Sequence, residues 1–151
     1  MADLIAAEAD VVSAFVLLLK EEQEILKAGS PEALPDVVER KTEVARKLAP
    51  LATARNTELA RAGFAADRPG IDAWLKKQPG DKGVRQHWER LQALAAEAKE
   101  LNRVNGELIR LRMQNNAQAL EALLAAANRQ DLYGADGQAA QATTRRIIDS
   151  A

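Results

Sequence analysis

The sequence predicts an all-α protein: an antiparallel three-helix bundle with a short connector helix and a long C-terminal helix that protrudes from it. Three observations support this fold class. Hydrophobic residues make up 47% of the 151-residue chain but aromatic residues only 3%, and Ala and Leu fill the difference. Ala, Leu, Glu, Lys, Arg and Gln are the best helix formers, whereas strands favour β-branched and aromatic residues. Apolar residues also recur at intervals of three, four and seven, which is the spacing of one helix face.

The first helix is expected at residues 3–28, with Asp3 as its N-cap and Gly29 as the glycine that follows its last turn. Its apolar stripe is formed by Ile5, Val12, Phe15, Leu19 and Leu26. The carboxylates of Glu21, Glu22 and Glu24 are interpreted as part of its solvated face. We therefore expect this helix to be amphipathic and to pack on one side.

The second helix is expected at residues 31–62. Ser30 supplies an N-cap hydroxyl, Pro31 is suited to the first helical position, and Gly63 ends the segment. Pro50 lies inside it and removes a backbone hydrogen bond, so the segment is either kinked or split, and one kinked helix is favoured. The two-residue link before it requires the first two helices to run antiparallel.

The connector and the last helix complete the predicted fold. Residues 71–77 can form two helical turns that pack Trp74 onto the bundle. The long helix is expected at residues 82–129 with Asp81 as its cap, about 70 Å at 1.5 Å per residue, so part of it should protrude. We expect a bundle domain at residues 1–130 and a flexible tail at residues 131–151, because the tail contains Gly134, Gly137 and many polar residues.

The composition argues against several classes of function. The chain has no cysteine, one histidine (His87) and a formal net charge of −1. We therefore expect no metal site, no cofactor, no catalytic residues and no nucleic-acid partner, and an enzyme is the weakest interpretation. No apolar run approaches the roughly 20 residues that span a membrane, so no membrane insertion is expected. These features predict a soluble cytoplasmic protein.

The second half of the long helix is the best candidate for a binding surface. Between residues 113 and 128 the only charged residue is Glu121, whereas surface helices normally carry several charges. Such a surface can receive another helix without burying an unpaired charge. The alternative is that it is ordinary bundle core or the seam of a homodimer through the long helix, and the pattern alone leaves that alternative open.

Two further features invite a functional interpretation. Asn102 and Asn105 share a helix face and precede Gly106, whose presence inside a helix permits close approach by a neighbour. The alternative is a helix break at Gly106, but good helix formers resume at once, so a continuous helix is favoured. Tyr133 is the only tyrosine and follows the predicted helix, where it is either an anchor for a partner or a cap folded onto the helix end.

The second half of the sequence contains Leu101-Asn102, Asn105-Gly106, Asn115, Gln118-Ala119-Leu120-Glu121, Leu124 and the run Leu132-Tyr133-Gly134-Ala135-Asp136-Gly137-Gln138. These residues resemble the FlgN family of flagellar type III export chaperones. The resemblance covers about 40 residues of the second half. The first half resembles the family only loosely, through its two amphipathic N-terminal helices. Pro50 and the residues after Gln138 depart from the family pattern.

The resemblance implies a helical cytoplasmic protein without enzyme activity. Proteins of this family bind the C-terminal helices of hook-associated junction proteins, prevent their premature assembly and deliver them to the export gate. The implied docking residue for the cytoplasmic domain of the export-gate membrane protein is Tyr133. The residues expected to bind the partner are Leu108, Leu111, Asn115, Leu120, Leu123, Leu124 and Leu132. The alternative function is a general helical adaptor or a self-associating coiled-coil protein.

Overall fold

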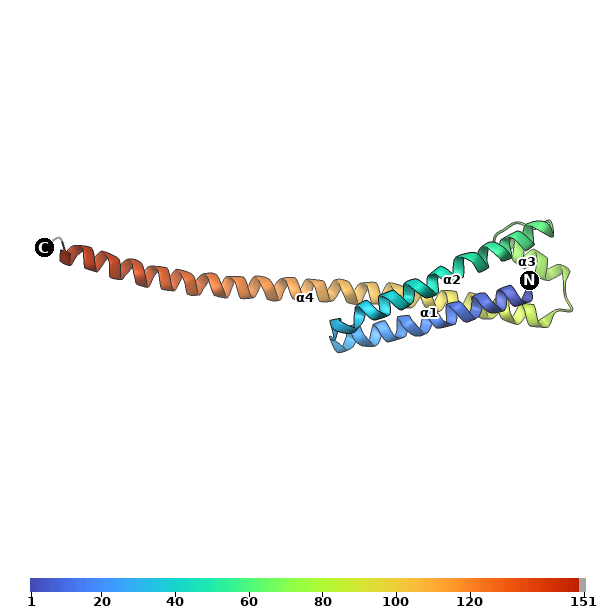
Figure 1. The fold of residues 1–151 in the computed structure, drawn as a ribbon, viewed down its shortest axis with the longest axis horizontal. Coiled ribbons are helices and arrows are strands. Elements are labelled where there is room, and N and C mark those ends of the chain that lie inside the picture. The colour runs from blue at the N-terminus through green and yellow to red at the C-terminus, as the bar shows by residue number, and fades with distance from the viewer. Residues whose placement is uncertain (150–151) are drawn as a thin grey trace. The chain divides into compact units, whose positions relative to one another are not determined.

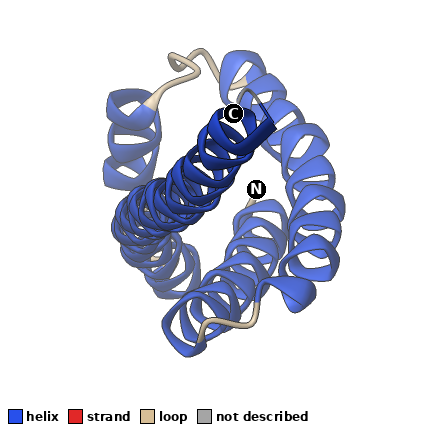
Figure 2. Ribbon diagram, turned by 90° about the vertical axis from the view of Figure 1, so that its left-hand side faces the viewer, coloured by secondary structure: helices blue, strands red, loops and turns tan. Residues whose placement is uncertain are grey.

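The structure is a computed structural model that describes the backbone of residues 1–149 and the side chains of residues 1–130. Its elements are α1 (Ala2–Ala28), a 3-10 turn η1 (Pro31–Ala33), α2 (Leu34–Arg61), α3 (Arg68–Lys77) and α4 (Lys82–Asp149). Every regular element in this part of the chain is helical, as Figure 2 shows, so the all-α prediction and the long C-terminal helix are confirmed.

The chain divides into two compact units, Met1–Ile109 and Arg110–Ala151, and the boundary between them lies inside α4. The first unit contains α1, α2, α3 and the beginning of α4, and the second continues α4. In each unit the residues contact one another more than they contact the other unit. The expected boundary between a bundle at 1–130 and a flexible tail at 131–151 stays a prediction.

The chain directions follow from the side-chain contacts within the first unit. Glu8 pairs with Arg55 and Glu22 with Lys41, so α1 and α2 are antiparallel, and Figure 1 shows them side by side. Asp10 pairs with Arg90, whereas the amide of Asn105 reaches Leu19, so α4 starts parallel to α1. The finer description as an antiparallel three-helix bundle with a protruding helix stays a prediction.

The main cluster of buried hydrophobic residues in the first unit includes α3, which closes one end of the helices, and Leu19, Leu26 and Val37 are buried farther along α1 and α2. Trp74 is 9% exposed and packs into this cluster, as the sequence predicts. The cap of α3 is Asp67, whose Oδ1 accepts a hydrogen bond from the backbone N–H of Gly70 at 2.7 Å. The buried core residues are Ile5, Ala9, Val12, Val16, Leu59, Ile71, Trp74, Leu75, Val84, Trp88 and Leu91.

Most of the predicted helix ends are found close to their expected positions. Gly29 and Gly63 adopt left-handed backbone angles of φ 78° and φ 79°, which glycine tolerates without strain. Asp81 caps α4 through a 3.1 Å bond from the Val84 N–H. The N-cap of α1 is Met1 and not Asp3. Asp3 is the second residue of the first turn, where its negative charge interacts favourably with the helix dipole.

Two segments differ from their predicted bounds. The first three residues after Ser30 form η1, and α2 then runs without a break through Pro50. The last helix continues to Asp149 and does not end at residue 129. Each of the two glycines beyond residue 130 costs about 1 kcal/mol relative to alanine, and the surrounding alanines and glutamines are good enough helix formers to offset this.

Candidate partner-binding surfaces

The second unit carries five exposed hydrophobic side chains on α4. They are between 46% and 68% exposed: Leu111, Met113, Leu120, Leu123 and Leu124. Glu121 is the only charged residue between positions 113 and 128. An apolar surface of this kind on a water-exposed helix is typical of a protein-binding site. At 3.6 residues per turn, Met113, Leu120, Leu123 and Leu124 share one face of α4, whereas Leu111 lies on the side opposite Leu120. We refer to Met113, Leu120, Leu123 and Leu124 as the leucine stripe.

The structure places the predicted partner-binding residues in different settings. Leu108 is half-buried within the first unit, and Asn115 is exposed. Leu120, Leu123 and Leu124 belong to the leucine stripe, whereas Leu111 is exposed on the opposite face of α4. The side chains of Leu132 and Tyr133 lie outside the part of the chain that the structure describes. Their assignments stay predictions.

The three residues of the predicted packing motif, Asn102, Asn105 and Gly106, also lie in different surroundings. Gly106 continues α4, as expected, but a Cβ placed on it would meet no atom within 4 Å among the described residues. Gly106 therefore permits close approach by another helix, but none of the described residues of this chain lies that close to it. Asn102 is exposed, whereas Asn105 is 1% exposed. The two asparagines have different roles although they share a helix face.

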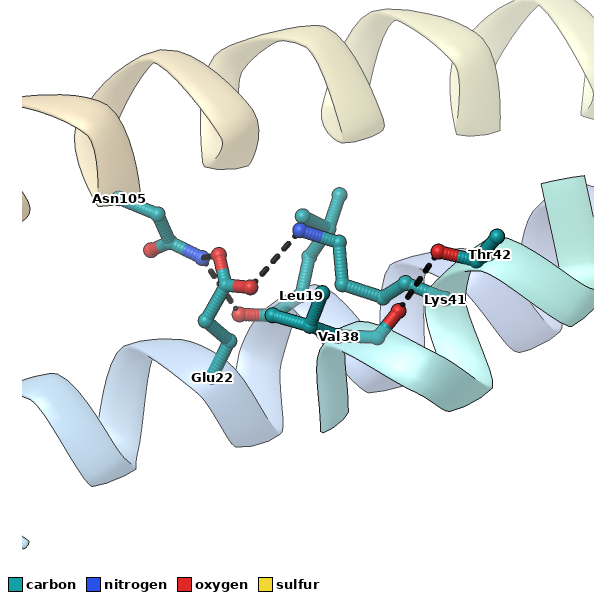
Figure 3. Close-up of polar contacts among 6 residues, drawn as sticks. All are labelled: Leu19, Glu22, Val38, Lys41, Thr42 and Asn105. Carbon is teal, nitrogen blue, oxygen red and sulfur yellow. Dashed lines mark hydrogen bonds and ion pairs between the residues drawn. The ribbon is translucent and has the colours of Figure 1, made fainter. Parts of the chain in front are cut away.

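Asn105 belongs to a buried polar network that joins α1, α2 and α4 (Figure 3). Its Nδ2 donates to the backbone carbonyl of Leu19 at 2.9 Å and to Glu22 Oε1 at 3.0 Å. The other oxygen of Glu22 accepts from Lys41 Nζ at 2.7 Å. Glu22 is only 4% exposed, so the prediction that it lies on a solvated face is wrong. Its carboxylate is tolerated in the interior because each of its oxygens has a donor.

A second buried carboxylate lies near the other end of α1. Glu8 is 1% exposed, and its Oε2 accepts from Arg55 Nη1 of α2 at 2.6 Å. The Arg55 guanidinium also lies 5.9 Å from the Trp88 ring. Burial raises the pKa of the Glu8 carboxyl, and the charge and hydrogen bond of Arg55 partly offset this effect. Glu8 Oε1 is buried with no hydrogen-bond partner among the described residues.

Between these two polar contacts lies an apolar depression lined by α1, α2 and α4. Two adjoining cavities of about 240 and 250 Å³ share Val12, Leu48 and Ala95. Ala45 and Ala98 line the first cavity, and Ala52 lines the second together with Glu8 and Arg55. We define the alanine groove as Val12, Ala45, Leu48, Ala52, Ala95 and Ala98. It lies within the first unit.

Sequence reasoning missed this groove and the two buried carboxylates. The signal was in the apolar spacing of α1, because Glu8 lies three residues after Ile5 and Glu22 lies three residues after Leu19. A carboxylate on the buried face of a helix indicates a buried ion pair. The antiparallel neighbouring helix is where the partner cation is expected. The groove had no comparable signal, since alanine is equally common on solvated helix faces.

Among the described residues, no group of three or more His, Cys, Asp or Glu residues is arranged to hold a metal ion. No described helix has both the length and the low charge content that crossing the hydrocarbon layer requires.

Comparison with known proteins gives one match. The model of a protein family described as FlgN protein matches residues 1–141. No curated protein and no solved structure was found to match the chain. The family match covers the whole first unit and residues 110–141 of the second, whereas the sequence resemblance rests on about 40 residues.

Proposed function

The chain belongs to the FlgN family of flagellar export chaperones, and on that premise we propose which partners it serves. It binds the C-terminal helical regions of hook–filament junction proteins in the cytoplasm. It keeps these subunits from premature assembly and delivers them to the type III export gate. The exposed leucine stripe of α4 is the observation that supports this assignment.

The physical basis is the covering of apolar surface. An export subunit that awaits assembly exposes an amphipathic helix, which promotes aggregation unless another apolar surface covers it. The leucine stripe offers such a surface and has a single charge between residues 113 and 128. A contact of this type is released readily when one partner must become ordered on binding, because the ordering entropy reduces the affinity. Easy release is what delivery to an export gate requires.

Two finer assignments are part of the same proposal. Residues from about Leu108 to Leu132 hold the client, and Tyr133 docks the loaded chaperone on the cytoplasmic domain of the export-gate membrane protein. The helices of the first unit form an antiparallel three-helix bundle that supports the long helix. The chaperone acts without catalytic residues, metal or cofactor.

Co-purification with the C-terminal helical segment of a junction protein tests the function. The full chain should retain the segment, and truncation after Arg129 should weaken retention. The triple variant Leu120→Ala, Leu123→Ala, Leu124→Ala should also weaken it. A matched control replaces Leu17 and Val38, which are 64% and 52% exposed on other helices, by alanine. Equal retention by the triple variant and this control would remove the leucine stripe from the proposal.

The docking of Tyr133 requires a separate experiment. The loaded chaperone is applied to the immobilised cytoplasmic domain of the export-gate protein. Tyr133→Ala should reduce retention of the complex while leaving client binding unchanged, and Tyr133→Phe separates the role of the ring from that of the hydroxyl. If Tyr133→Ala binds the gate as well as the unchanged chain does, the docking assignment is wrong.

The alternative function, a helical adaptor or self-associating coiled-coil protein, makes a different prediction. Its long helix would form a tight homodimer that ignores junction-protein segments. Native mass measured with and without the client segment distinguishes the two functions. A dimer that persists in the presence of excess segment would favour the adaptor.

A further inference from the structure

Positive charge gathers at the end of the first unit that α3 closes. Residues 61–90 contain seven basic and four acidic residues, a net charge of +3, although the whole chain has a net charge of −1. One of the seven, Arg90, pairs with Asp10. The other six are exposed and form no ion pair with any carboxylate of the described residues. We define the basic end by these six residues: Arg61, Arg68, Lys76, Lys77, Lys82 and Arg85.

The opposite end of the same unit carries the opposite charge. Residues 21–43, where α1 ends and α2 begins, contain seven acidic and three basic residues. All three of those cations form ion pairs with carboxylates of the same segment. The 27 residues of α1, about 40 Å at 1.5 Å per residue, separate this segment from the basic end (Figure 1). Because salt screens charges beyond about 8–10 Å, the two ends do not neutralise each other.

The carboxylates within residues 61–90 are engaged by groups other than the cations. Asp67 and Asp81 accept hydrogen bonds from backbone N–H groups as the caps of α3 and α4. Asp72 accepts from the indole N–H of Trp88 at 3.1 Å. Glu89, the fourth, is exposed and forms no ion pair with a described residue. Helix capping and a buried indole therefore leave the cations of the basic end without intramolecular partners.

The surplus of cations does not lie in the depression between α3 and α4. That depression has a volume of about 300 Å³ and is balanced in charge, since its lining holds two cations and two carboxylates. The charged lining residues are Lys76, Arg85, Asp72 and Glu89. Of the remaining cations, Arg68 donates to Gln92 Oε1 at 3.0 Å. The surplus is therefore carried mainly by Arg61, Lys77 and Lys82.

The surface chemistry favours an acidic protein segment over other polyanions. Single-stranded nucleic acids stack their bases on exposed aromatic rings, and membrane surfaces take up apolar side chains. Trp74 and Trp88 are 9% and 8% exposed, and the half-buried ring of Phe64 has Lys77 Nζ 4.9 Å from its centroid. No large hydrophobic side chain of residues 61–90 is exposed. Carboxylates on a protein helix or loop require neither feature, because they pair directly with the cations.

A second copy of this chain is a poorer partner than a different protein. Its carboxylates are concentrated in residues 21–43, but four of the seven already form ion pairs within the chain. Contact between the opposite ends of two copies is also heterologous, so one basic and one acidic end stay uncovered. Such a contact continues into an open filament instead of closing into a dimer.

We propose that the basic end is a docking surface for an acidic segment of another protein, whose carboxylates pair with Arg61, Lys77 and Lys82. The inference goes beyond the proposed function, because the client site is assigned to the second unit and the basic end belongs to the first. Exposed charge pairs contribute more to the rate and specificity of association than to affinity. Docking at this surface is therefore fast, of moderate affinity and sensitive to salt.

Binding of an acidic peptide tests the proposal. The probe is a fluorescein-labelled peptide of about 20 residues, long enough to form a helix, with glutamate at every third or fourth position. Its affinity for the full chain is measured by fluorescence anisotropy at about 50 and 300 mM salt. The unchanged chain should bind it at the lower salt concentration and at least fivefold more weakly at the higher one. The same peptide with glutamine in place of glutamate should not bind.

Two triple variants distinguish local charge from overall charge. Arg61→Gln, Lys77→Gln, Lys82→Gln should weaken binding of the acidic peptide at least fivefold. The matched control is Arg46→Gln, Lys47→Gln, Lys99→Gln, which changes the net charge equally. Its three cations are likewise exposed and form no ion pair with described residues. The control should weaken binding less than twofold, and circular dichroism establishes that both variants retain their helices.

Several outcomes would overturn the proposal. If the unchanged chain does not bind the acidic peptide, or if both triple variants lose affinity equally, the basic end is not a docking surface. Tighter binding of an oligothymidylate or of phosphatidylserine vesicles, lost in the first triple variant, would make the partner a nucleic acid or a membrane. A native mass that grows with concentration at low salt, and does not grow in that variant, would make it a second copy. None of these measurements involves a junction protein, so each is independent of the proposed function.

Carbodiimide crosslinking locates the bound peptide directly. The reagent joins a carboxylate to a lysine amine that it already contacts, and mass spectrometry identifies the lysine. Crosslinks to the acidic peptide should form at Lys76, Lys77 and Lys82 and not at Lys47 or Lys99. Crosslinks spread evenly over all five lysines would contradict the proposal.

Discussion

The side-chain amide of Asn105 in α4 donates a hydrogen bond to the buried carboxylate of Glu22 in α1 at 3.0 Å. Lys41 of α2 pairs with the same carboxylate at 2.7 Å, so one buried anion receives donors from both neighbouring helices. The two contacts are separated by 83 and 19 residues in sequence. This arrangement fixes the relative register of three helices at one point.

Removing the Asn105 amide should destabilise the protein. Asn105→Ala leaves Glu22 Oε1 and the Leu19 carbonyl without this donor, and we expect the free energy of unfolding to fall by about 1–3 kcal/mol. Asn102→Ala is the control, because Asn102 is exposed one turn earlier, and its effect should stay within about 0.5 kcal/mol. Urea denaturation followed by circular dichroism measures both, and equal losses would contradict the structural role of Asn105.

The buried carboxyl of Glu8 should give the stability a defined pH dependence. Because burial raises its pKa in the folded state, the folded protein binds this proton more tightly than the unfolded chain does. The contribution of Glu8 therefore falls as the pH rises from the unfolded pKa through the raised folded pKa. We expect the difference in unfolding free energy between the unchanged chain and Glu8→Gln to be larger at about pH 4 than at about pH 7. A difference that grows with pH would indicate that the Arg55 pairing outweighs desolvation.

Two glycines should respond to alanine in opposite directions. Gly106 lies inside α4 with no atom within 4 Å of a built Cβ, so Gly106→Ala should stabilise the chain by about 1 kcal/mol. At Gly70 the same Cβ would lie 1.9 Å from the Ala65 carbonyl oxygen, and Gly70→Ala should destabilise by roughly 1–3 kcal/mol. Thermal melting compares the two variants, and a destabilised Gly106→Ala would reveal a contact that the described residues do not show.

Pro50 should lower the stability of α2. It is exposed and lies inside the helix, where proline lacks the N–H that the preceding turn requires. Pro50→Ala should raise the free energy of unfolding by up to about 3 kcal/mol. The control is Ala49→Ser, which leaves the backbone donors unchanged on the adjacent position. If Pro50→Ala instead lowers the free energy of unfolding, the proline must give α2 a local bend that its packing against the other helices requires.

The helices could be predicted from the sequence because their signals are local. The periodic spacing of α1, the cap at Asp81 and the glycines at 29 and 63 all depend on neighbours a few residues away, and the structure has them where they were expected. The predicted end of the long helix at residue 129 is wrong because the glycines that follow do not stop the helix. The cost of a glycine, about 1 kcal/mol, is small beside the propensity of an alanine-rich segment.

The candidate site was only partly predictable, and for a physical reason. The leucine stripe follows from one helix and its charge content, so it could be found without tertiary information. The alanine groove depends on how far α2 stands from α4, and alanines at positions 45, 52, 95 and 98 carry no signal of that distance. Buried Glu8 and Glu22 were similarly ambiguous, because a carboxylate is stable inside only when a distant cation such as Arg55 or Lys41 reaches it.

The packing of α2 has a mechanical consequence. Val37 and Leu59 are the buried residues near the two ends of α2, whereas Leu48 in its middle is only partly buried against the core, so the middle is held less firmly than the ends. Pro50, which lacks one backbone hydrogen bond, lies in this span and lowers the local bending stiffness. The width of the alanine groove can thus adjust while both ends of α2 remain packed. Two firmly packed ends with a more compliant span between them would let the distance between α2 and its neighbours vary without unpacking the core.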